Sequence, residues 1–206
     1  VLGLLVVLIA VLSIFMIPST SGEKLTSTTS PFVMLKNKSI VLIILLTFLG
    51  VCAHYGVYTY ITQLVVEVGI KGGVEMALFI FGLGSLISVV VVTKYIDKYL
   101  RELSVLTFSL LGIVMLLFFF FRGVNVITQL GFFLWGLLYG PLVTLFQAAV
   151  GNQVEHAKDV AMSVQSCMFN LSIMLTTWIA GLLLIHFGTC SLLWYATLLV
   201  IPGIII

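Results

Sequence analysis

A few polar side chains interrupt the long apolar runs of this chain, and they are the residues best suited to bind a solute or a proton. His54 and Tyr58 lie on a polar arc of the run 38–66, if that run is a helix with 3.6 residues per turn. An imidazole titrates near neutral pH, and a phenol both donates and accepts hydrogen bonds. The arc therefore predicts a pocket-lining face, although hydrogen bonding between helices would produce the same pattern.

Asn170 is the corresponding candidate in the run 160–186. An unpaired amide in hydrocarbon costs several kcal/mol, so Asn170 needs a partner on another helix or on a ligand. Gln165 projects from the opposite side of the same run and is interpreted as structural. Trp135, about two turns from the predicted outer end of the run 125–149, is a further candidate for lining the pocket.

Two short patterns suggest how such a pocket is built and closed. Gly136 and Gly140 are spaced to allow close helix contact, and the Pro141 that follows predicts either a moving kink or a fixed bend. Between two apolar runs, Asp97 stands beside two cations, Lys98 and Arg101. This charged group predicts a latch between helix ends, or it only sets the topology of the chain.

The patterns of enzymes are absent from the sequence. It contains no H-E-x-x-H, no G-x-S-x-G and no P-loop. The histidines, His54, His156 and His186, are too scattered for a metal cluster, and the cysteines form no C-x-x-C pair. We therefore predict no catalytic residues, no metal and no cofactor, and we expect a protein that is not an enzyme.

The elements that position these residues are predicted to be membrane-spanning helices. Hydrophobic residues make up 62% of the 206 residues and charged residues only 8%. About 20 apolar residues cross a bilayer as a helix, in which every backbone group is paired. The fold class is an all-α membrane protein, with helices expected at 1–17, 38–66, 75–93, 103–121, 125–149, 160–186 and 189–206.

The cations indicate how these helices are oriented. The connections 18–38, 94–102 and 150–159 together carry seven Lys and Arg, whereas the alternate connections carry only Lys71 and Arg122. Cytoplasmic loops are enriched in Lys and Arg, which places the first set in the cytoplasm and removes the need for a nucleic-acid partner. Both ends of the chain lie inside apolar runs, so we expect it to be part of a longer protein.

Several segments resemble one group of transporters. The segment 53–61, which contains His54 and Tyr58, resembles the seventh helix of major facilitator superfamily efflux proteins, in the drug:H⁺ antiporter group that includes sugar, arabinose and nucleoside efflux permeases. The loop 93–101 resembles the second copy of the superfamily signature G-x-x-x-D-R-x-G-R, with Thr93 and Leu100 in place of its two glycines. Further matching segments, similar to the eighth, tenth and eleventh helices, are 81–84, 135–136, 147, 169–171 and 181.

This resemblance implies the register of the whole chain. Residues 1–17 would end transmembrane helix 6, residues 18–37 would form the central cytoplasmic loop, and residues 38–206 would form the C-terminal six-helix domain, helices 7–12 with the last truncated. The partner would be the missing N-terminal half, within the lipid of a bacterial inner membrane. In such antiporters the carboxylates credited with proton coupling usually lie in that half.

The implied function is efflux of small organic solutes by alternating access, coupled to protons. His54, Tyr58, Asn170 and Trp135 would line the substrate site, and Asp97, Lys98 and Arg101 would form the cytoplasmic gate. Two alternatives stay open: an uncoupled facilitator or importer of sugar-like solutes, and a non-transporting receptor or assembly partner on the same scaffold. A pH gradient across proteoliposomes distinguishes the first alternative, and the presence of solute flux distinguishes the second.

Overall fold

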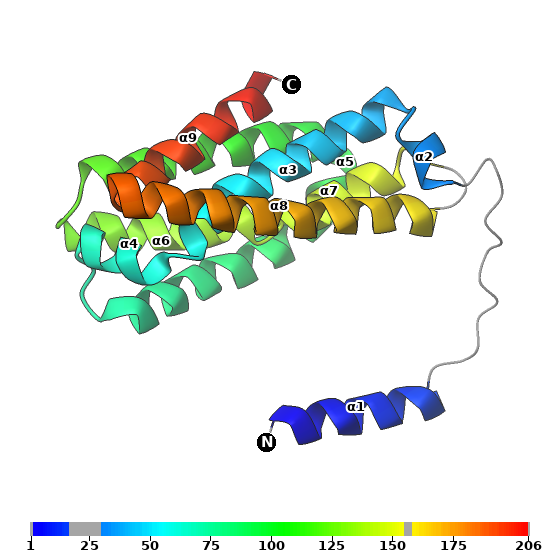
Figure 1. Ribbon diagram of the computed structural model, residues 1–206, viewed down its shortest axis with the longest axis horizontal. Coiled ribbons are helices and arrows are strands. Elements are labelled where there is room, and N and C mark those ends of the chain that lie inside the picture. Colours follow the sequence, from blue (N-terminus) through cyan, green and yellow to red (C-terminus); the bar gives the residue numbers. More distant parts are fainter. Residues whose placement is uncertain (1, 17–29, 155–157, 206) are drawn as a thin grey trace.

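The computed structural model describes residues 2–16, 30–154 and 158–205, and this part of the chain contains helices and connections but no strand. The predicted all-α membrane fold is confirmed. Most of the predicted central loop, 18–37, lies outside the described residues. The helices (Figure 1) are α1 Leu2–Met16, α2 Pro31–Met34, α3 Lys38–Tyr58, α4 Ile61–Val68, α5 Gly73–Phe120, α6 Asn125–Tyr139, α7 Leu142–Gly151, α8 Lys158–Phe187 and α9 Cys190–Ile205.

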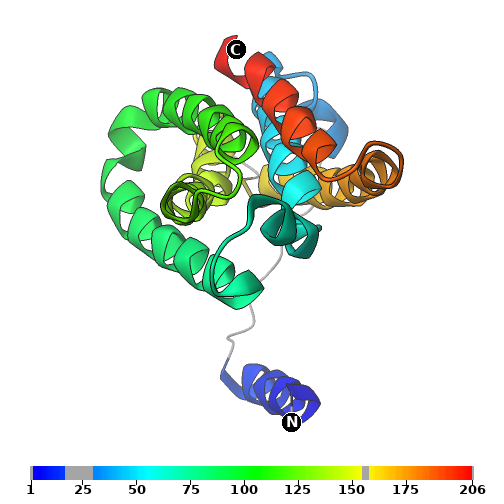
Figure 2. The same cartoon turned by 90° about the vertical axis from the view of Figure 1, so that its left-hand side faces the viewer.

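Five helical segments are long and apolar enough to cross a membrane. They lie at Lys38–Tyr58, Gly73–Val90, Lys98–Phe120, Asn125–Gly151 and Lys158–Phe187, and α9 is a shorter apolar helix. Seen along the helices, α6 lies between the two halves of α5, while α3, α8 and α9 form the other side of the bundle (Figure 2). The segment Gly73–Val90 and helix α8 bury few of their residues, whereas α3 is more than half buried.

Two of the predicted helix boundaries are wrong. In both cases the helix is distorted at a tyrosine rather than at a glycine or a proline. The predicted helix 38–66 is interrupted at Tyr60, whose φ of −108° and ψ of 33° are not helical. The predicted loop 94–102 is instead helical, and the chain turns there at Tyr99, with φ −127° and ψ 33°. The stretch contains no glycine or proline to stop a helix, so one distorted residue replaces the loop.

The helix is interrupted at the predicted position, Gly140–Pro141, although both residues keep dihedral angles of the right-handed helical region. Helix α6 ends at Tyr139, and α7 begins at Leu142. The N–H of Gly140 still donates to the Gly136 carbonyl at 2.9 Å. Pro141 has no N–H to continue this ladder, which explains why the two segments separate here.

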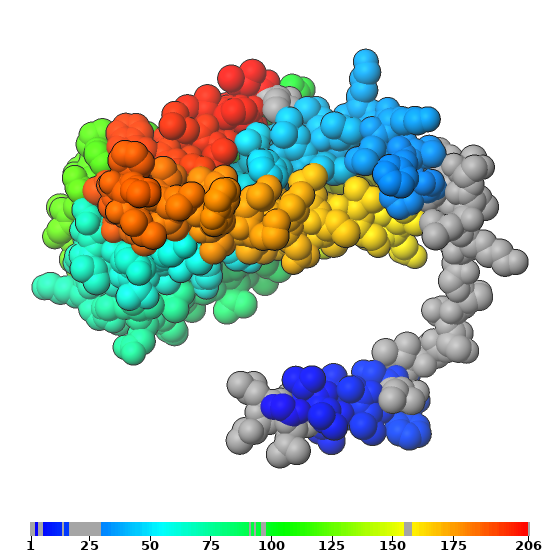
Figure 3. Space-filling model, viewed as in Figure 1, coloured from blue at the N-terminus to red at the C-terminus, as the bar shows by residue number. Residues whose placement is uncertain are grey.

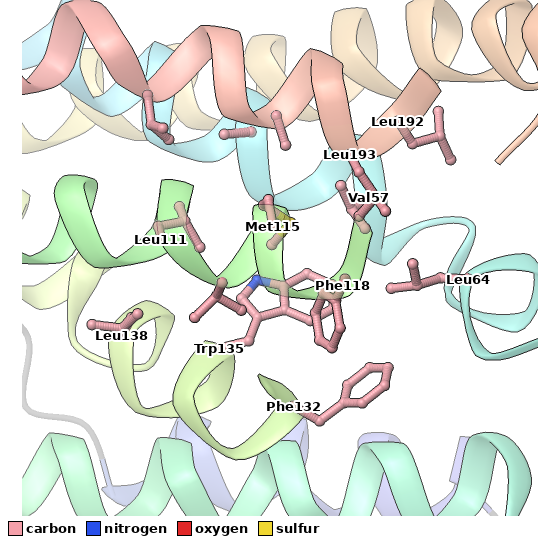
Figure 4. Packing of buried hydrophobic residues seen from close by; sticks show 14 of the residues in the cluster. Val57, Leu64, Leu111, Met115, Phe118, Phe132, Trp135, Leu138, Leu192 and Leu193 are labelled. Carbon is pink, nitrogen blue, oxygen red and sulfur yellow. The ribbon is translucent and has the colours of Figure 1, made fainter. Parts of the chain in front are cut away.

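A large apolar core holds the bundle together. Trp135, Phe118 and Phe132 are fully buried and lie close together, with Met115 and Leu64 nearby (Figure 4). The rings of Phe118 and Phe132 are 4.8 Å apart between centroids, and Trp135 lies within 6.0 Å of both. Because these side chains come from α4, α5 and α6, the core fixes the position of α6 within the bundle.

At the predicted outer end, three side chains form a group that we call the outer cluster: Glu67, Arg122 and Cys190. Arg122 Nη1 donates to Glu67 Oε1 at 2.8 Å and to Cys190 Sγ at 2.9 Å. The Cys190 thiol donates to Glu67 Oε1 at 3.2 Å. The Arg122 hydrogen bond and charge lower the pKa of the Glu67 carboxyl. The outer cluster ties together the end of α4, the α5–α6 turn and the start of α9.

Candidate solute-binding site

A small pocket of about 230 Å³ lies between α7 and α8. Of the residues that the structure describes, none that lines it is charged; they are Val143, Gln147, Gln165, Ser166, Phe169 and Asn170. Three amides, a hydroxyl and an aromatic ring provide both donors and acceptors next to an apolar face. Such a lining suits an uncharged polar molecule, because the pocket offers no countercharge to an ion.

Gln165 is the most constrained of these amides. Its side chain is only 4% exposed, and Nε2 donates to Thr47 Oγ1 of α3 at 3.5 Å. Its Oε1 atom is buried without a hydrogen-bond partner among the described residues. The position of Gln165 on the opposite side of the helix from Asn170 predicts a structural role for it. In the structure both residues line one pocket, and α7 brings Gln147 against them.

Asn170 has a partner different from the two expected. Its Nδ2 group donates to the Ser166 carbonyl of its own helix at 2.8 Å, and the residue is exposed. Ser166 Oγ likewise donates to the Met162 carbonyl at 2.9 Å. Helix α8 crosses the face of the bundle seen in Figure 3. Ser166 and Asn170 are therefore bonded within α8, whereas Thr176 Oγ1 joins α8 to the Cys52 carbonyl of α3 at 2.9 Å.

His54 lies in a second group, the aromatic cluster, which consists of His54, Tyr55, Tyr58, Phe81, Trp135 and Tyr139. The imidazole stacks on the Tyr139 ring, with centroids 3.2 Å apart and planes 6° apart. On α3 itself, Tyr58 stacks at 5.0 Å and 21°. Trp135 lies at 5.3 Å and Phe81 at 5.9 Å. His54 is 2% exposed, so the rings enclose it.

The aromatic cluster contains three buried polar atoms that have no hydrogen-bond partner within the described part of the chain. They are His54 Nδ1, Trp135 Nε1 and the Tyr139 hydroxyl. A buried polar group without a partner costs about 1–3 kcal/mol, so a concentration of three is costly. Such groups call for an explanation, and a bound molecule or an alternative conformation supplies one.

Tyr55 connects the aromatic cluster to the pocket. Its ring lies 6.1 Å from that of Tyr139 and 6.0 Å from that of Phe169, edge-on to both. The structure thus brings three predicted residues, His54, Tyr58 and Trp135, into one cluster and places Asn170 in the adjoining pocket. Trp135 is also fully buried in the core and does not line the pocket.

Glycines explain why α5 can reach this cluster. A Cβ atom on Gly136 would overlap the Phe81 carbonyl, and one on Gly84 would overlap the Phe133 carbonyl. The backbones of α5 and α6 are therefore in direct contact. This contact places Phe81 against Trp135, with ring centroids 5.4 Å apart. Phe81 thereby closes one side of the aromatic cluster around His54.

The predicted cytoplasmic gate is described only in part. The side chain of Asp97 lies outside the described residues, although its backbone is part of α5. Lys98 Nζ lies 5.0 Å from the centroid of the Tyr99 ring, and Arg101 is exposed. The gating role of the three residues stays a prediction.

Comparison with known proteins gives two findings. Residues 1–160 match the Major Facilitator Superfamily. A probable sugar efflux transporter of Helicobacter acinonychis is 26% identical over 175 residues, which cover 84% of this chain and 44% of that protein. A probable sugar efflux transporter of Mannheimia succiniciproducens is 23% identical over 201 residues, covering 93% and 49%. The chain spans about half the length of the curated relatives it matches.

Proposed function

This chain belongs to the Major Facilitator Superfamily, and from that premise we propose that it is the C-terminal half of a carrier that exports small organic solutes by alternating access. It is an integral, multi-pass membrane protein, and the family points to transport rather than catalysis. The bacterial relatives favour the inner membrane. The six helical segments of 38–206 would move against an N-terminal half around a shared central site.

The observation that carries this proposal is the uncharged pocket between α7 and α8, joined through Tyr55 to the aromatic cluster. Amides that bind hydroxyl groups, next to rings that stack on an apolar face, favour a sugar-like solute. The printed names of the relatives support the same class. Drug-like and nucleoside-like solutes would use the same stacking surfaces.

We expect the carrier to exchange solute for protons, and Asp97, Lys98 and Arg101 to latch its cytoplasmic ends. One observation favours the uncoupled alternative. Among the described residues, the side chains of Glu67, Glu75, Glu102 and Asp159 lie near helix ends or beside the kink at Tyr99, so this half presents no carboxylate at mid-span. Solute flux with and without an imposed pH gradient separates exchange from facilitation.

Substitutions in the pocket test the proposal. The full-length protein is reconstituted in proteoliposomes, and efflux of radiolabelled arabinose is measured for wild type, Gln165→Ala and Asn170→Ala. Loss of an amide that binds the solute should lower the initial rate by about tenfold, because a lost hydrogen bond to a buried partner costs roughly 1–3 kcal/mol. Ser163→Ala is the matched control on α8, since its hydroxyl bonds only its own helix. Unchanged rates in both amide variants would remove this pocket from the solute path.

A further inference from the structure

His54 is the histidine that lies inside the bundle, among the residues that the structure describes. It is almost completely buried in α3, between the predicted cytoplasmic end at Lys38 and the outer cluster at Glu67. The other described histidine, His186, is exposed in the last turn of α8. An imidazole can take up and release a proton, which makes His54 an interior candidate for proton binding.

The surroundings of His54 suit a cation as well as a neutral ring. The rings of Tyr139 and Tyr58 stack on the imidazole, with centroids at 3.2 and 5.0 Å. Aromatic faces attract a cation within about 6 Å, and both stacked rings lie in that range. An imidazolium at this position would therefore be held by the aromatic cluster without a carboxylate.

The remaining groups that face His54 carry no charge. From α3 they are the phenols of Tyr55 and Tyr58, from α6 the phenol of Tyr139 and the indole of Trp135, and from α5 the Phe81 ring. Within the described residues, His54 Nδ1 has no donor or acceptor opposite it.

Tyr139 is the ring that lies closest to His54. Tyr139 covers one face of the imidazole, and it is the last residue of α6, directly before the Gly140–Pro141 break. Its own hydroxyl is also without a partner in the described part of the chain. A movement at the break would shift the Tyr139 ring, and Tyr55 links this position to the pocket at Phe169.

We infer that His54 is a proton-binding site of the transport cycle. Its imidazole takes a proton from water when Tyr139 moves and the aromatic cluster opens toward one side of the membrane. It releases that proton to water when the cluster opens toward the other side. The step is a reversible protonation of imidazole to imidazolium, so no oxidant or further reactant takes part. This inference rests on the proposed function and deepens it by naming a group that couples protons to solute within this half.

A titration that needs no substrate tests the site directly. The full-length protein is labelled with ¹³C-histidine, placed in nanodiscs and followed by NMR from pH 5 to 8. His54→Gln identifies the His54 signal by its loss, and His186→Gln identifies an exposed histidine as a reference. We expect the His54 signal to titrate, and Tyr139→Ala to make its exchange with solvent faster. A His54 signal that stays constant over this range in both wild type and Tyr139→Ala would overturn the inference.

The second measurement is the response of transport to protons. Arabinose flux in proteoliposomes is recorded with and without a pH gradient, and each protein is described by the ratio of the two rates. We expect a ratio near ten in wild type and near one in His54→Gln, which keeps an amide but cannot titrate. An equal ratio in both proteins would contradict the inference. If wild type moves no arabinose, the proposed substrate class fails, whereas the titration still decides the role of His54.

Discussion

The outer cluster and the aromatic cluster treat their polar groups in opposite ways. In the outer cluster, Arg122, Glu67 and Cys190 are all paired with one another, in contact with solvent. In the aromatic cluster, three polar atoms are buried without partners within the described residues. Paired polar groups hold helix ends together with little desolvation penalty. Unpaired polar atoms are still free to form a hydrogen bond with a ligand or to bind a proton. The outer cluster therefore contributes to stability by pairing, whereas the aromatic cluster keeps three unpaired polar atoms next to the apolar core.

The largest effect is expected from Trp135, which belongs to both the core and the aromatic cluster. Trp135→Ala should lower the free energy of unfolding by about 3–5 kcal/mol, because it leaves a cavity where a fully buried ring was. Trp135→Phe should cost much less, since it keeps a ring and removes the unpaired N–H. Denaturant unfolding of the full-length protein in detergent measures both, and Trp178→Ala, at 66% exposure, is the control. Equal losses in both Trp135 variants would contradict the expectation that a ring at this position fills most of the space.

The next effect concerns the contact between α5 and α6 that closes the aromatic cluster. Gly136→Ala should destabilise the protein by about 1–3 kcal/mol or more, because its Cβ would overlap the Phe81 carbonyl. Gly82→Ala is a matched control on α5, where an added Cβ meets no atom within 4 Å. The same unfolding experiment compares them. If Gly136→Ala were as stable as Gly82→Ala, the backbones of α5 and α6 would not be in direct contact.

The smallest effect is expected at the outer cluster. Arg122 holds the pKa of Glu67 below its ordinary value of 4.5, so their pairing stabilises the fold above that pH and is lost as pH falls through the lowered pKa. Glu67→Gln should lower the melting temperature by only a few degrees at pH 7, because the pair is solvent-exposed. The difference from wild type should vanish toward pH 3. A difference that grew on acidification would contradict this role.

Much of the fold is predictable from the sequence, because apolar length and sparse charge determine which segments cross a membrane. The interruption at Pro141 is also predictable, because proline has no N–H to donate within a helix. The distortions at Tyr60 and Tyr99 are not, since neither residue is a usual helix breaker and tertiary packing sets their dihedral angles. No pattern in the sequence distinguishes these tyrosines from the others.

The candidate site is predictable only to the extent that one helix defines it. The polar arc of α3 identifies His54 and Tyr58, and an amide within an apolar run identifies Asn170. Gln165, Gln147 and Phe169 are missed, because periodicity along one helix does not give the rotation of its neighbours. The amide side chains within 142–151 and 158–170 were the available signal for these pocket residues. Its meaning depends on α7 lying against α8, which the sequence does not specify.

The internal bonding of α8 has a mechanical consequence. Ser163, Ser166 and Asn170 each bond a carbonyl of their own helix, four residues earlier. These three side chains can move past a neighbour without losing their bonds, whereas Thr176 Oγ1, which donates to the Cys52 carbonyl at 2.9 Å, ties α8 to α3. The face of α8 that carries Ser163, Ser166 and Asn170 is thus the one that can exchange its contacts, and the face against α3 is held in place.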